Sequence, residues 1–133
     1  MNDRFFIDSN VALYLVREFS EKKDTALNFL EKIPVISIQV INENINVCHK
    51  KFELSVEIIQ KHITTLFEKC IVAQISRETT EKAIRILLKY KYSYYDSLII
   101  ASALENNCKI LYSEDLQHKQ IIEKTLTIIN PFI

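Results

Sequence analysis

The sequence predicts an α/β protein in which helices cover a central, mostly parallel sheet. Short apolar segments alternate with longer amphipathic segments along the 133 residues. Strands that alternate with helices in this way are typical of parallel sheets. The segment 96–106 is apolar on nearly every side, which predicts a helix buried inside the fold. The length favours a single domain, 1–133, with its own core.

Each expected element has a local signal. Ser20 and Ser76 begin helices, the latter with a capping-box pattern, and Pro34 ends the helix before it. Apolar runs predict strands over 4–8, 35–38, 71–75, 109–113 and 125–132. Helices are expected over 10–16, 20–33, 39–52, 55–70, 76–91 and 96–106, with a short helical turn over 114–120.

The apolar spacing also predicts which helix faces are buried. The helix 39–52 places one set of residues on a single face, and the helix 55–70 repeats the pattern. The first set is Ile41, Ile45, Cys48 and Phe52, and the second is Val56, Ile59, Ile63 and Leu66.

The composition excludes several classes of protein. No glycine occurs, so a Walker A loop and a GxGxxG dinucleotide loop are both absent. A left-handed helix end must then use asparagine, and the segment 105–109 is expected to form such an end. Three scattered cysteines without a CxxC fit a reducing cytosol and no disulfide framework. No signal pattern and no apolar run of membrane-spanning length occurs, so we expect a cytoplasmic protein.

Four carboxylates follow the expected strands or open the buried helix: Asp8, Glu43, Asp96 and Asp115. Ligands of open parallel sheets bind beyond the carboxyl ends of the strands, so these side chains are expected at one edge. Asn10 and Ser113 are expected to support them by orienting a carboxylate or a metal-bound water.

Each residue also has a purely structural interpretation. Asp8 is suited to cap the following helix, and Ser93 with Asp96 fits a capping box. Asp115 fits the first turn of a helix, Glu43 a solvated helix border, and Ser113 a turn. Capping explains an acid at the start of a helix, but it does not explain four acids at one edge of the sheet. Such a cluster is costly, because two carboxylates about 4 Å apart repel by roughly 4 kcal/mol.

A carboxylate cluster requires shared protons or bound cations. Oxygen ligands suit a hard ion such as Mg²⁺ or Mn²⁺, which activates water for phosphodiester hydrolysis. The formal net charge is zero, so a nucleic acid would be held by a local patch or through metal ions.

A tyrosine- and lysine-rich stretch precedes Asp96. Aromatic rings interleaved with lysines are suited to bind single-stranded RNA, or the rings pack on the sheet or in a dimer interface. The candidates for RNA contact are Lys89, Tyr90, Lys91, Tyr92 and Tyr94. The three scattered histidines, His49, His62 and His118, are expected at the surface, without a role in the site.

Four segments resemble the acidic motifs of PIN-domain ribonucleases, and most of all the VapC toxins of prokaryotic toxin–antitoxin pairs. They are "FIDSNVALYL", "INEN", "YYDSLIIASAL" and "ILYSEDLQH…INPF", in the family's order over nearly the whole chain. Asn107 and Lys119 stand where many relatives have glycine, and Gln117 where some carry another acid or Asn.

The resemblance implies a three-layer α/β/α fold and an endoribonuclease that depends on Mg²⁺ or Mn²⁺. The same acidic residues would form the site. The departure at Gln117 favours one tightly bound ion, or a second that is recruited with the substrate. It also implies cleavage of transfer or ribosomal RNA, inhibition of translation, a VapB-like antitoxin partner and a homodimer. Two alternatives keep an α/β fold: a degenerate PIN domain that only binds RNA or protein, and a phosphoacceptor domain. The start Asp8-Ser9-Asn10 lacks the D-x-D of dehalogenase-type phosphoacceptors.

Overall fold

The computed structural model describes residues 3–133 and contains one mixed sheet with helices on both sides. The strands are β1 (Phe5–Ile7), β2 (Val35–Ser37), β3 (Ile71–Ala73), β4 (Ile110–Tyr112), β5 (Ile121–Ile122) and β6 (Leu126–Ile129). The helices are α1 (Ser9–Leu13), the 3₁₀ helix η1 (Tyr14–Val16), α2 (Glu21–Glu31), α3 (Ile38–Lys50), α4 (Val56–Lys69), α5 (Arg77–Tyr90) and α6 (Tyr94–Glu105).

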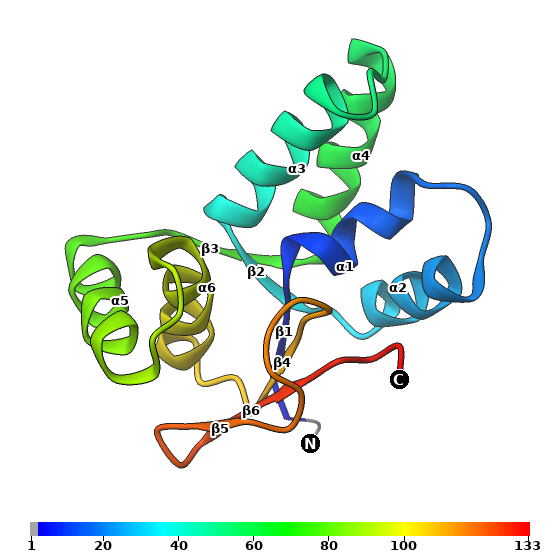
Figure 1. Cartoon of the computed structure of the whole chain (residues 1–133). Helices are drawn as coiled ribbons and strands as arrows, with labels where there is room; N and C mark the ends of the chain where they lie inside the picture. Colours follow the sequence, from blue (N-terminus) through cyan, green and yellow to red (C-terminus); the bar gives the residue numbers. More distant parts are fainter. Residues whose placement is uncertain (1–2) are drawn as a thin grey trace.

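The sheet has the strand order β3-β2-β1-β4-β6-β5. Every neighbouring pair is parallel except β5 and β6, which form an antiparallel hairpin. Helices α5 and α6 lie on one side, α1 and α2 on the other, and α3 and α4 form a hairpin beyond the end of β2 (Figure 1). The predicted fold, a three-layer α/β/α arrangement around a mostly parallel sheet, is confirmed.

Both faces of the sheet are packed. Phe5 and Tyr112 of the central strands contact Phe29 of α2, with ring centroids 5.5 and 4.3 Å from that ring. The intervening Phe6 and Leu111 are fully buried. Every residue of α6 from 97 to 103 is buried, as the sequence predicted for this helix. No helix within residues 3–133 is long and apolar enough to cross a membrane.

Left-handed backbone is supplied by residues other than glycine, and not by asparagine alone as expected, because Lys91 ends α5 with a φ of 66°. Asn107 follows the end of α6 with a φ of 58°, which confirms the predicted asparagine helix end. Lys119 has a φ of 69°, so Asn107 and Lys119 both adopt the left-handed conformation that glycine favours.

The structure differs from the sequence-based expectations at several places. Residues 114–120 form bends and turns and not a helical turn, and the strand β5 was not foreseen. Ile45 and Val56 were expected on buried faces, but their side chains are 38% and 69% exposed. The polar residues Asn44 and His62 are buried between the two helices instead.

These two polar residues are paired across the helix hairpin. His62 is buried rather than at the surface, and its Nε2 lies 2.9 Å from Asn44 Oδ1. Asn44 Nδ2 donates to the carbonyl of Val40 at 2.9 Å. Burial lowers the pKa of His62 to about 4, so the ring is neutral at pH 7. Because the partners satisfy each other, a buried polar pair replaces apolar packing between α3 and α4.

Candidate functional site

The predicted carboxylates meet in one cavity of about 350 Å³, called here the acidic pocket. It lies beyond the carboxyl end of β1, between α1 and α3. Its lining comprises Asp8, Ser9, Asn10, Leu13, Gln39, Glu43, Asn46, Val47, Asp96, Ile99 and Asp115. Four of these residues are acidic, and no lysine, arginine or histidine is among these described lining residues.

Asp8 is the most buried of the four carboxylates, with 7% of its surface exposed. It caps α1 and also faces the pocket, so the two interpretations of this residue are compatible. Its Oδ1 accepts from the backbone N–H of Ser9 at 2.7 Å, and its Oδ2 accepts from Ser113 Oγ at 2.8 Å. The end of strand β1 therefore positions the Asp8 carboxylate, and the two hydrogen bonds fix the direction of both carboxylate oxygens.

Glu43 reaches the pocket from the middle of α3. Ser9 Oγ donates to its Oε1, and Gln39 Nε2 donates to its Oε2 at 3.3 Å. Gln39 is spaced i, i+4 from Glu43 on the helix and also donates to the carbonyl of Tyr95 at 3.0 Å. Glu43 is thus half-buried and oriented, not a solvated residue at the helix border.

Asp96 enters from the first turn of α6. Ser93 caps this helix by accepting from the backbone N–H of Asp96 at 3.2 Å. Within residues 3–133 no reciprocal bond from the Asp96 carboxylate to Ser93 occurs, whereas Ser76 and Thr79 form a complete capping box on α5. The Asp96 carboxylate therefore remains free to face the pocket.

Asp115 lies on the loop after β4 and is held from α1. Asn10 Nδ2 donates to Asp115 Oδ2 at 3.0 Å, and Asn10 Oδ1 accepts from the backbone N–H of Glu114 at 3.3 Å. Ser113 Oγ accepts from the backbone N–H groups of Asp115 and Leu116, both at 3.3 Å. Ser113 thus combines the turn chemistry expected of it with a bond to Asp8.

The electrostatics of the pocket favour a bound cation. Burial is the largest cause that raises the pKa of Asp8, to about 7, and the negative charges of Glu43 and Asp96 raise it further. The hydrogen bonds from Ser113 and Ser9 oppose this shift. A buried carboxylate among like charges, with no cationic side chain in the described lining, is stabilised by a proton or by a metal ion.

The donor set also fits a hard ion. All acidic groups of the pocket offer oxygen, the ligand that Mg²⁺ and Mn²⁺ prefer. Gln39 Oε1 is buried and has no hydrogen-bond partner among the described residues, so it can accept from a metal-bound water. Within residues 3–133 no three His, Cys, Asp or Glu side chains lie close enough together to form a ready-made metal-binding group.

The tyrosine- and lysine-rich stretch lies outside the described lining of the acidic pocket. The Lys89 amine and the Tyr90 hydroxyl donate to Glu123 Oε2 at 2.8 and 2.7 Å, and Tyr90 accepts from the backbone N–H of Glu123 at 3.0 Å. Tyr92 donates to the Gln120 side chain and accepts from the backbone N–H of Gln117 at 3.1 Å. These side chains fasten the β5–β6 hairpin to α5.

Lys91 and Tyr94 take no part in this anchor. Lys91 is exposed at the left-handed end of α5, and the Tyr94 ring packs on a small cluster between α5 and α6. Their contact with RNA stays a prediction, as does that of Lys89, Tyr90 and Tyr92.

Sequence reasoning missed Ser9, Gln39 and Asn46 as lining residues. Ser9 follows Asp8 directly, and Gln39 precedes Glu43 by one helical turn, so both positions carried a usable signal. Asn46 lies next to Val47, which also lines the pocket, but no motif or spacing in the sequence singles out Asn46.

Comparison with known families decides the classification. The family model of the PIN domain matches residues 5–124. The chain belongs to the PIN-domain family. The four acidic positions of this PIN domain are therefore brought together by the fold to which the sequence motifs pointed. No curated protein matches the sequence.

Solved structures with the same fold include components of toxin–antitoxin systems. A toxin–antitoxin complex from Klebsiella pneumoniae has a TM-score of 0.72 and 20% identity, covering 97% of this chain and 98% of that chain. VapC20 of Mycobacterium tuberculosis is described as a toxin that cleaves the sarcin–ricin loop. It has a TM-score of 0.68 and 15% identity, covering 84% of this chain and 89% of that chain. DNA-bound VapBC from Salmonella typhimurium has a TM-score of 0.67 and 16% identity, covering 96% of this chain and 97% of that chain. The resemblance stated from the sequence is confirmed at the level of the fold.

Proposed function

We propose that this PIN domain is a metal-dependent endoribonuclease that hydrolyses phosphodiester bonds of RNA. The observation that supports it most is the acidic pocket: four carboxylates converge, one of them buried, and no basic side chain is among the described lining residues. Such a pocket has little affinity for a phosphate by itself, because it would add negative charge to negative charge. A cation held by these carboxylates would offset their negative charge towards a phosphate.

Asp8, Glu43, Asp96 and Asp115 would hold Mg²⁺ or Mn²⁺. When bound, such an ion polarises the phosphoryl oxygen and lowers the pKa of a coordinated water. The residues of the chain orient the ligands. Ser113 and the Ser9 amide fix Asp8, Ser9 and Gln39 fix Glu43, and Asn10 fixes Asp115. Such outer partners account for roughly 10–100-fold in metal affinity or activity.

The biological role that fits best is the toxin of a toxin–antitoxin pair that inhibits translation. Support comes from the fold shared with toxin–antitoxin proteins over more than four fifths of this chain. We therefore propose transfer or ribosomal RNA as the substrate, a VapB-like antitoxin as the partner and a homodimer as the assembly. The proposal also includes one domain over residues 1–133 and a cytoplasmic location.

The test is RNA cleavage by the purified chain. Total cellular RNA is incubated with Mg²⁺ or Mn²⁺, with EDTA, and with the variants Asp8→Asn and Asp96→Asn. We expect discrete metal-dependent products, and a loss of about 100-fold or more in both variants, because first ligands matter at least as much as their outer partners. Asp24→Asn, an exposed carboxylate on α2, is the matched control and should cleave normally.

Two results would contradict the proposal. Full activity in a folded Asp8→Asn or Asp96→Asn variant would remove these residues from the metal site. Failure of the unsubstituted chain to bind metal and to cleave any RNA would favour a PIN domain that only binds RNA or protein.

A further inference from the structure

A second cavity lies beside the acidic pocket and is called here the aromatic hollow. Its volume is about 730 Å³, and its described lining is Tyr14, Val16, Arg17, Glu18, Phe19, Ser20, Lys22, Phe52 and Leu54. Leu13 and Val47 line the acidic pocket, whereas Tyr14 and Phe52, further along the same two segments, line the hollow. The two cavities therefore follow each other along α1–η1 and the α3 segment.

Arg17 lies close to two aromatic rings of this hollow. Its guanidinium carbon lies 5.6 Å from the ring centroid of Tyr14 and 5.3 Å from that of Phe52. Among residues 3–133 its side chain forms no ion pair and no hydrogen bond, although it is exposed. Two rings thus fix a charged group whose donors are all available. A planar guanidinium with free donors is suited to a bidentate phosphate contact.

Lys22, the other cation of the hollow, is already occupied. Its amine contacts Glu114 Oε2 at 2.5 Å and the Tyr14 hydroxyl at 3.3 Å. Tyr14 donates to the second oxygen of Glu114 at 2.7 Å. Glu114 precedes Asp115, so this group ties the wall of the hollow to the loop of the acidic pocket. Arg17 remains as the cation open to a ligand.

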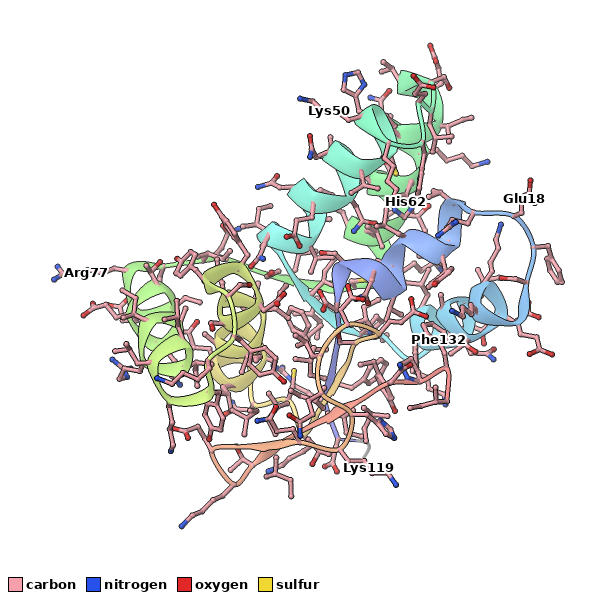
Figure 2. The ribbon with its side chains drawn as sticks, in the orientation of Figure 1. Glu18, Lys50, His62, Arg77, Lys119 and Phe132 are labelled. Atoms are coloured by element: carbon pink, nitrogen blue, oxygen red, sulfur yellow. The ribbon has the colours of Figure 1, made fainter. Side chains whose placement is uncertain are left out.

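The rim carries an aromatic ring without a packing role. Phe19 is 80% exposed, between Arg17 and the start of α2. Aromatic side chains in a positively charged groove bind single-stranded nucleic acid by base stacking, at about 4–16 nucleotides per site. Glu18 is the one carboxylate in the described lining, and Figure 2 shows it at the outer edge of the loop.

We propose that the aromatic hollow binds the RNA segment next to the bond that is cleaved. Arg17 contacts a phosphate of that segment, and Phe19 stacks on one of its bases. This inference rests on the proposed ribonuclease function, and it assigns substrate binding to residues outside the acidic motifs. The charges are complementary: the acidic pocket requires a metal ion to receive a phosphate, whereas the hollow offers a cation of its own.

The experiment measures RNA binding by the full chain in EDTA, where cleavage is suppressed. The probe is a fluorescent single-stranded RNA of about 12 nucleotides, within the site sizes of such proteins. The variants are Arg17→Gln and Phe19→Ala. Arg77→Gln is the matched control, because Arg77 is exposed on α5 at the opposite side of the molecule (Figure 2). A poly-glutamate peptide of similar length tests an acidic protein segment in place of RNA.

We expect Arg17→Gln to weaken RNA binding about tenfold and to lower the salt slope of log K by about 0.7, the value for one phosphate contact with a single strand. Phe19→Ala should weaken binding about fivefold or more without changing the slope. Arg77→Gln should change neither quantity, and circular dichroism should show all variants folded.

Several results would overturn the inference. These are unchanged affinity and slope in folded Arg17→Gln, no RNA binding by the unsubstituted chain, or Arg17-dependent binding of poly-glutamate without RNA binding. The outcome is separable from the proposed function. Arg17-dependent RNA binding without metal-dependent cleavage leaves the hollow intact and refutes the nuclease, and normal cleavage with an unaffected Arg17→Gln variant refutes the hollow alone.

Discussion

Replacing Asp8 by Asn should stabilise the metal-free protein, and only above a defined pH. Burial and the neighbouring carboxylates raise the pKa of Asp8 from 3.8 to about 7. Between pH 3.8 and about pH 7, the Asp8 carboxyl is therefore protonated in the folded state and ionised in the unfolded state. Stability contributed by the protonated form is complete below pH 3.8 and is lost as the pH rises towards 7. The difference between the two pKa values of Asp8 corresponds to roughly 4 kcal/mol of folding free energy.

An asparagine keeps the shape of the side chain without the charge. We expect Asp8→Asn in EDTA to exceed the wild type by roughly 2–4 kcal/mol in free energy of unfolding at pH 8, because the amide retains some of the bonds to Ser113 and Ser9. At pH 4 the two proteins should be nearly equal. Urea unfolding followed by circular dichroism measures both values, with Asp24→Asn as the exposed control.

Adding Mn²⁺ at pH 8 should raise the stability of the wild type and close most of this gap, since a ligand that binds only the folded state stabilises it. An Asp8→Asn variant that is less stable than the wild type at pH 8, or a difference that is the same at pH 4 and pH 8, would refute the reasoning.

Two further predictions concern residues that hold the fold and the site. His62 has a pKa lowered to about 4 by burial, so the contribution of this residue to stability should fall by roughly 3 kcal/mol between pH 6.5 and pH 4, while the contribution of Asp8 changes in the opposite direction. His62→Gln should therefore gain stability relative to the wild type as the pH falls over this range in urea unfolding, and parallel pH profiles for the two proteins would contradict the reasoning. Ser113→Ala removes a bond that lowers the pKa of Asp8, so RNA cleavage should fall roughly 10–100-fold and require a higher pH. A pH–rate profile identical to that of the wild type would exclude a role for the hydroxyl.

The convergence of the acids was predictable because it follows from topology. Asp8 comes directly after β1, and Asp115 comes shortly after β4, which pairs with β1 in parallel. Strand ends that meet at one edge bring such residues together without any knowledge of side-chain packing. Glu43 was harder to place, since a helix position shows its direction only when the packing of α3 is known.

The end of the chain was predicted less well, and turn chemistry is the reason. The β5–β6 hairpin turns through Glu123 and Lys124, with φ values of 48° and 64°. Hairpins of this type usually carry Asn-Gly or Asp-Gly, and neither occurs here. The turn is instead held from a distance, by Lys89 and Tyr90 on Glu123. A contact between residues more than thirty positions apart leaves no local signal.

The polar pair between α3 and α4 was missed for a related reason. Periodicity identifies a buried face by its apolar residues, so a buried Asn44 counts against the correct face and favours Ile45. A partner for His62 likewise becomes visible only when the two helices are placed side by side.

The absence of glycine has a consequence for how the site can move. Loops that close over a substrate need backbone positions that absorb large changes in φ and ψ, often at small residues. This chain contains no glycine, and its left-handed positions are held by bulkier side chains such as Lys119. If the proposed function holds, accommodation of an RNA strand falls mainly to side-chain rotation and not to backbone motion. The proposed ribonuclease would then select its substrate by fit to a preformed surface, and not by folding a lid around it.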